Sequence, residues 1–169
     1  MGFFQKLFKG QEAPAFEAQP MTVLAPMDGR VLPLAQIPDE VFSSGVLGPG
    51  CGIEPTGNTV CAPFPGKITQ VAETKHAVGL ESTDGIEVLI HVGMDTVKMN
   101  GAGFTALVKE GSTVKAGTPL LRVDLDAIRA AGYPTTTAVV VTNGDDFSST
   151  ELLADGSVAS GTPLLKVKA

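Results

Sequence analysis

Short apolar runs separated by turn-forming residues dominate the chain from about residue 21 onward. Val, Ile, Leu and Thr fill these runs, and Gly, Pro, Asn or Asp stands between them. Runs of this length favour β-strands joined by tight turns over helices. The pattern predicts strands over residues 30–34, 67–72, 78–81, 86–91, 105–108, 119–124, 137–142 and 163–167.

One segment carries the signals of an ordered helix. Asp124 and Asp126 would form an acidic first turn, and Gly132 would end the helix. A second, shorter turn is expected over residues 145–149. Two pairs of segments repeat a turn that leads into a strand, residues 25–31 with 62–68 and residues 117–123 with 161–167. Because these units follow one another without helices between them, the predicted fold class is all-β, a sandwich or a barrel.

The first ten residues differ from the rest. Apolar residues recur there at helical spacing with lysines on the other side, namely Phe3, Phe4, Leu7 and Phe8 with Lys6 and Lys9. A basic amphipathic segment of this kind suits an anionic membrane surface, and a frayed terminus without function is the alternative. Residues 11–20 have the character of a linker. We therefore expect a tail and linker over 1–20 and one domain over 21–169.

Composition narrows the possible partners and compartment. The formal charge of −6 and the pI near 4.8 argue against nucleic acid as a partner, because phosphate binding needs a basic surface. No apolar run approaches the roughly 20 residues of a membrane span. Cys51 and Cys61 match no CxxC spacing and are predicted to be buried, unbonded side chains. Free cysteines indicate a reducing, cytoplasmic location.

The chain has two histidines, and each lies where a strand signal meets a small or turn-forming residue. His91 ends an apolar strand and is followed by Gly93, and His76 follows Thr74 by two residues. A turn at Asp84-Gly85 would pair the two strands as a hairpin and bring both imidazoles to one end. If residues 74–76 were extended, the Thr74 hydroxyl would share a face with His76 and orient it. Such a pair could carry a phosphoryl group, hold a metal or share a hydrogen-bond network.

A set of short motifs resembles one known family over residues 22–168. The motifs are Ala25-Pro26-x-x-Gly29, Ile37-Pro38-Asp39, Val41-Phe42, Gly48-x-Gly50, Pro55-Thr56-Gly57-Asn58, Ala62-Pro63-x-x-Gly66, Glu73-Thr74-x-His76-Ala77 and His91-x-Gly93-x-Asp95-Thr96-Val97. They resemble the glucose-type enzyme IIA components of the bacterial phosphoenolpyruvate-dependent sugar phosphotransferase system. The short amphipathic start also resembles the membrane-associating tail of free-standing members, which would place the chain at the inner face of the cell membrane.

The resemblance implies an antiparallel β-sandwich and a phosphoryl relay that needs no cofactor. His91 would accept the phosphoryl group from the carrier protein HPr and pass it to a cysteine of a transporter's enzyme IIB domain. His76, held by Thr74, would stabilise the group. The resemblance also implies a partner-binding surface made of Asp39, Val41, Phe42, Val46, Leu47 and Asp95.

Two other functions compete with the relay. A lipoyl or biotinyl carrier would share turns such as Lys109-Glu110-Gly111, but its modified lysine would have to follow that segment and does not. A zinc hydrolase lacks a third ligand beside the two histidines. Zinc at His76 and His91, adventitious or at an interface, and a non-catalytic interaction module stay open as alternatives.

Overall fold

The computed structural model describes residues 16–169. The predicted amphipathic tail (1–10) and the first part of the linker (11–15) lie outside the described residues. The strands are β2 (Thr22–Leu24), β3 (Gly29–Pro33), β4 (Gly50–Pro55), β5 (Thr59–Cys61), β6 (Gly66–Val71), β7 (Ala77–Ser82), β8 (Glu87–His91), β9 (Phe104–Ala106), β10 (Thr113–Val114), β11 (Pro119–Val123), β12 (Thr137–Val141), β13 (Ser149–Leu152), β14 (Ser157–Val158) and β15 (Pro163–Lys168). The helices are short: η1 (Leu34–Gln36), α2 (Glu40–Ser43), η2 (Thr96–Met99), α3 (Leu125–Ala130) and η3 (Gly144–Asp146).

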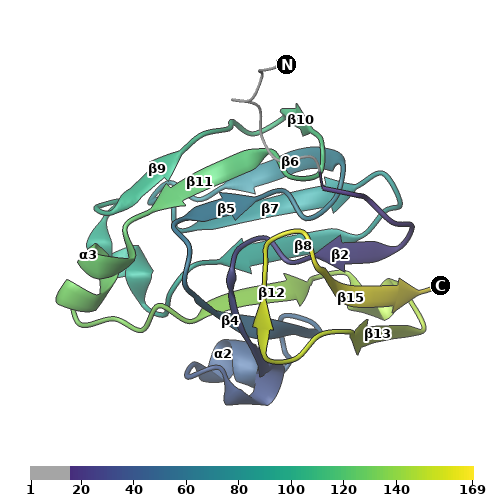
Figure 1. The fold of residues 1–169 in the computed structure, drawn as a ribbon, viewed down its shortest axis with the longest axis horizontal. Helices are drawn as coiled ribbons and strands as arrows, with labels where there is room; N and C mark the ends of the chain where they lie inside the picture. Colours follow the sequence, from purple (N-terminus) through teal and green to yellow (C-terminus); the bar gives the residue numbers. More distant parts are fainter. Residues whose placement is uncertain (1–15) are drawn as a thin grey trace, which may run out of the picture.

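Within residues 16–169, all strand pairs are antiparallel, and they form three sheets. The large sheet has the order β10-β6-β7-β8-β12-β4-β3-β14, and two three-stranded sheets have the orders β5-β11-β9 and β13-β15-β2. In Figure 1, strands β6, β7, β8, β12 and β4 follow one another from the top to the bottom of the view. The main core contains side chains from all three sheets, such as Val23, Ile90 and Leu121. The all-β sandwich with short helices is thereby confirmed.

Strand β8 separates two hydrophobic clusters. Val88 and Ile90 point into the main core, whereas Leu89 packs against a second cluster on the opposite face of the large sheet. This outer cluster consists of Ile37, Phe42, Met94, Ala138 and Val140. The segment with η1 and α2 thus covers part of the outer face, and His91 shares this face because it follows Leu89 by two positions.

The sequence predicted the long strands better than the short ones. All eight predicted strands exist, and α3 begins after Asp124, whose carboxylate accepts a hydrogen bond from the Ala127 N–H as an N-cap. Sequence reasoning missed the short strands β2, β5, β10, β13 and β14. It also missed the six-residue β4, which contains Gly50 and Gly52. At Gly52 a Cβ would come within 2.9 Å of the Ile37 side chain, so the strand needs glycine there for the covering segment to pack.

Both cysteines are free and buried, as predicted. Burial raises the pKa of the Cys51 thiol to about 12, so this side chain stays protonated at neutral pH. It lies in the main core and acts there as a small apolar residue.

Candidate functional site

His91 is the last residue of β8, near the centre of the large sheet. It pairs with Ala77 on β7 and with Ala138 on β12. Its Nδ1 lies 2.9 Å from the Gly93 carbonyl oxygen. Because a carbonyl can only accept, Nδ1 carries the proton and donates it. In the neutral ring the lone pair is then on Nε2, and the partly exposed side chain makes that atom a potential nucleophile.

The Gly93 carbonyl is held in place by a tight turn. Gly93 has φ +75°, and a Cβ at this position would lie 2.4 Å from Cγ2 of Thr96. Thr96 is fully buried, and its hydroxyl donates to the Val92 carbonyl at 2.6 Å. Glycine is therefore required for the turn that fixes the tautomer of His91.

His76 lies in the turn that leads into β7. The residue is only 7 % exposed, and its backbone carbonyl accepts a 2.8 Å hydrogen bond from the Val92 N–H. Its Nδ1 lies 2.7 Å from the Thr74 hydroxyl, so the predicted pair exists. The prediction that residues 74–76 are extended is wrong, because they form a turn in which Lys75 has φ +63°. The turn, and not strand alternation, brings the hydroxyl to the ring.

The two imidazoles meet edge to face. Their ring centroids are 4.7 Å apart, with an interplanar angle of 85°. Phe42 packs on His91 with a centroid distance of 4.9 Å, and Phe104 lies 6.5 Å from His76. The hairpin of β7 and β8 sets the spacing of the histidines, as predicted from the Asp84-Gly85 turn. Sequence reasoning missed Phe104, because it comes from β9 and no local pattern links it to His76.

Burial keeps both imidazoles neutral near pH 7. Desolvation and the neighbouring His76 lower the pKa of His91 from 6.5 to about 4, while the Gly93 carbonyl and the Asp39 carboxylate oppose this shift. Desolvation also lowers the pKa of His76. A pair of neutral rings can offer one lone pair and one N–H donor to the same small group.

The residues predicted to bind partners come from two segments that flank the histidines. Asp39 caps α2 by accepting from the Val41 N–H at 2.9 Å, and its charge acts on His91. Val41 and Val46 are 52 % and 74 % exposed, whereas Leu47 is half-buried against the outer cluster. Phe42 differs from these, since it is buried and supports the His91 ring.

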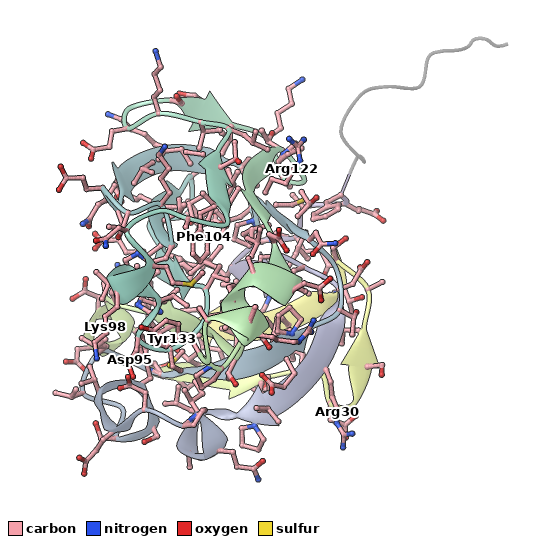
Figure 2. All side chains as sticks on the ribbon, turned by 90° about the vertical axis from the view of Figure 1, so that its left-hand side faces the viewer. Arg30, Asp95, Lys98, Phe104, Arg122 and Tyr133 are labelled. Carbon is pink, nitrogen blue, oxygen red and sulfur yellow. The ribbon has the colours of Figure 1, made fainter. Side chains whose placement is uncertain are left out.

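The second segment follows His91. Asp95 is exposed, has φ +61° and lies directly before η2 (Figure 2, with Lys98). Val97 in η2 is 50 % exposed, and the sequence analysis did not assign it to the partner-binding surface. The available signal was that Val97 is an apolar residue two positions after Asp95 in the same motif.

Residues 16–169 contain no group of three histidine, cysteine or acidic side chains arranged to hold a metal ion. Within the same range, no helix has the length and apolar character needed to cross a membrane.

Comparisons with known proteins show which family the chain belongs to. Residues 21–147 match the model of the family described as the phosphoenolpyruvate-dependent sugar phosphotransferase system, EIIA 1. Among curated proteins, the chain is 42% identical over 98% of its length to the beta-glucoside-specific EIIBCA component of Bacillus subtilis. It is 43% identical over 87% of its length to the N-acetylglucosamine-specific EIICBA component of Klebsiella pneumoniae. It spans 27% and 23% of these longer proteins.

Among solved structures, the glucose permease IIA from Mycoplasma capricolum superposes with a TM-score of 0.80 at 34% sequence identity. The superposition covers 87% of this chain and 95% of that one. The matched family segment includes both histidines and both flanking segments. The chain thus belongs to the EIIA 1 family of the phosphoenolpyruvate-dependent sugar phosphotransferase system, and it is a phosphotransferase component of that system.

Proposed function

We propose that His91 carries a phosphoryl group between two protein partners. Its Nε2 attacks the phosphorus of a phosphohistidine on the carrier HPr, so that a new N–P bond forms as the donor's N–P bond breaks. A cysteine thiolate of an enzyme IIB domain then attacks the same phosphorus, and His91 leaves with its Nε2 lone pair restored. The observation that carries the proposal is the hydrogen bond from His91 Nδ1 to the Gly93 carbonyl. Because Nδ1 carries the proton, the lone pair of the neutral ring is on Nε2 and can act as the nucleophile.

We assign His76 as the group that stabilises the transferred phosphoryl group. If the Thr74 hydroxyl donates to Nδ1 of His76, the neutral ring has its proton on Nε2. That N–H can donate to a phosphoryl oxygen on the neighbouring ring, whose centroid is 4.7 Å away. Placement and charge stabilisation of this kind are what phosphoryl transfer requires of a protein, and no cofactor is needed.

We propose that the segments beside the histidines form a docking surface made of Asp39, Val41, Val46, Leu47, Asp95 and Val97. Its apolar side chains would exclude water from the transfer, because a partner seated on them covers His91. Its carboxylates would attract a basic partner and raise the encounter rate. The buried Phe42 supports this surface from beneath.

An enzyme IIB domain as acceptor is supported by the printed names of the curated relatives, in which A, B and C components share one chain. HPr as donor rests on the family resemblance. The two free cysteines fit a reducing, cytoplasmic location. Weak contact of residues 1–10 with an anionic membrane stays a proposal from their sequence.

Intact-mass measurement after incubation with phosphoenolpyruvate, enzyme I and HPr tests the relay. Wild-type protein should gain one acid-labile phosphoryl group, and His91→Ala should gain none. His76→Gln should accept the group and donate it to enzyme IIB slowly, because it keeps the nucleophile and loses the stabilising donor. An adduct on His91→Ala would refute the assignment of the nucleophile. A His76→Gln protein that cannot be phosphorylated would refute the division of roles.

Zinc at the histidine pair is a second candidate, favoured by the 4.7 Å separation of the rings. Two imidazoles leave a tetrahedral site incomplete, so a partner's carboxylate or Asp95 would have to contribute. Calorimetric titration with zinc, with and without the partner, checks this function. Binding only in the complex would indicate an interface metal, and no binding in either state would exclude the candidate.

A further inference from the structure

A cleft of about 460 Å³ lies at the end of the small sheet β5-β11-β9, outside the relay residues. Its polar and aromatic lining consists of Asn58, Phe104, Thr105, Arg122, Asp124 and Asp126. The volume falls within the range of roughly 300–1,000 Å³ that is usual for small-molecule sites. Phosphoryl transfer at His91 uses none of these side chains, so the cleft needs an explanation of its own.

The floor of the cleft is an outward face of two paired strands. Arg122 on β11 stands opposite Thr105 on β9, and both side chains are exposed. Within residues 16–169, Arg122 makes no ion pair. Figure 2 shows Arg122 and Phe104 in the upper half of this side of the molecule, away from Asp95 and Lys98. The guanidinium therefore offers its donors to a ligand.

The two carboxylates of the cleft keep acceptor capacity. Asp124 uses Oδ1 to cap α3, and Asp126 uses Oδ1 to accept from Arg129 at 3.0 Å. The second oxygen of each carboxylate faces no partner in the described residues. The cleft is lined by one arginine and two aspartates, so it has no excess positive charge for a phosphate or another anion.

We propose that this cleft binds a neutral, hydroxyl-rich small molecule of about mono- to disaccharide size. Vicinal hydroxyl groups both donate and accept, and they match an arginine fork, a carboxylate oxygen, the Asn58 amide and the Thr105 hydroxyl placed around one space. Phe104 supplies an apolar wall for the C–H groups of such a molecule. A sugar phosphate would meet the carboxylates of Asp124 and Asp126 and bind more weakly.

Binding of a ligand in the cleft can be detected at the His76 imidazole. The Phe104 ring lines the cleft and also lies 6.5 Å from His76 at an angle of 68°. A ligand that displaces this ring changes the ring current felt by the His76 imidazole. The imidazole signal of His76 is therefore a second reporter beside the signals of the cleft residues.

NMR titration of the isotope-labelled chain with glucose, maltose, glucose 6-phosphate and serine tests the proposal. We expect saturable shifts of Thr105, Asp124 and His76 signals with at least one of the two neutral sugars. Arg122→Ala should weaken that binding about tenfold, because it removes charged hydrogen-bond donors. Arg30→Ala is the matched control: Arg30 is also exposed on a strand, and it lies at the lower end of the view in Figure 2.

Three outcomes would overturn the proposal. One is the absence of saturable shifts with both neutral sugars. Another is sugar binding that Arg122→Ala leaves unchanged or that Arg30→Ala weakens equally. The third is binding of glucose 6-phosphate or serine in preference to the neutral sugars, which would assign the cleft to a charged ligand. The spectrum of each variant also reports whether it folds, and phosphorylation of His91 is not required for any of these results.

Discussion

The lowered pKa of His91 makes the stability of the protein depend on pH in a way that can be calculated. The folded chain binds a proton at His91 only near pH 4, whereas the unfolded chain binds it near pH 6.5. As the pH falls through this window the unfolded state takes up the proton first, so the free energy of unfolding decreases. From pH 7.5 to pH 4.5 the loss from this one group is about 2.5 kcal/mol.

Urea denaturation of wild-type protein and His91→Gln at these two pH values measures the effect. His76, whose pKa is also lowered by burial, is present in both proteins, and the difference between the two pH responses reports on His91. We expect the wild type to lose about 2.5 kcal/mol more than the variant over this range. Equal losses would show that His91 titrates normally in the folded state and would refute the argument for a neutral, desolvated nucleophile. With two histidines in the sequence, an imidazole NMR titration can assign both pKa values directly.

Three further substitutions test how the site is held. Thr74→Val removes the hydroxyl that contacts His76, and it should slow donation to enzyme IIB about tenfold while Thr74→Ser restores it, as followed by rapid-quench transfer assays. Gly93→Ala forces a Cβ to within 2.4 Å of Thr96 at a positive φ, and it should lower the free energy of unfolding by more than about 1 kcal/mol in urea titrations. Asp124→Ala removes the cap of α3, and its thermal unfolding should show a loss of about 1 kcal/mol with phosphorylation of His91 unchanged.

The parts of the site that depend on neighbouring residues were predictable from the sequence. The Asp84-Gly85 turn fixes the register of β7 with β8. In this register His91 lies opposite Ala77, the residue that follows His76. The Thr74 contact was predicted for the wrong reason, because a left-handed residue in a turn gives no signal in an apolar–polar pattern. Local spacing is thus sufficient to locate the pair and insufficient to describe its backbone.

The parts that depend on distant residues were not predictable. The apolar character of Phe42 is visible in the sequence, but its position under the His91 ring follows from how α2 packs across the sheet. Phe104 contacts His76 for the same kind of reason. Strand β4 was missed because its glycines lower strand propensity, and the packing of Ile37 on Gly52 outweighs that cost.

The position of the two histidines on one hairpin has a consequence for how the protein opens. Strands β7 and β8 lie inside the eight-stranded sheet, so their amide hydrogens should exchange with solvent only when the whole domain unfolds. The four-residue helix α2 lies at the surface and should exchange through smaller, more frequent openings. The histidine pair and the proposed docking surface should therefore open with different free energies. Mild heating should weaken partner recognition before it disturbs the geometry of the imidazoles.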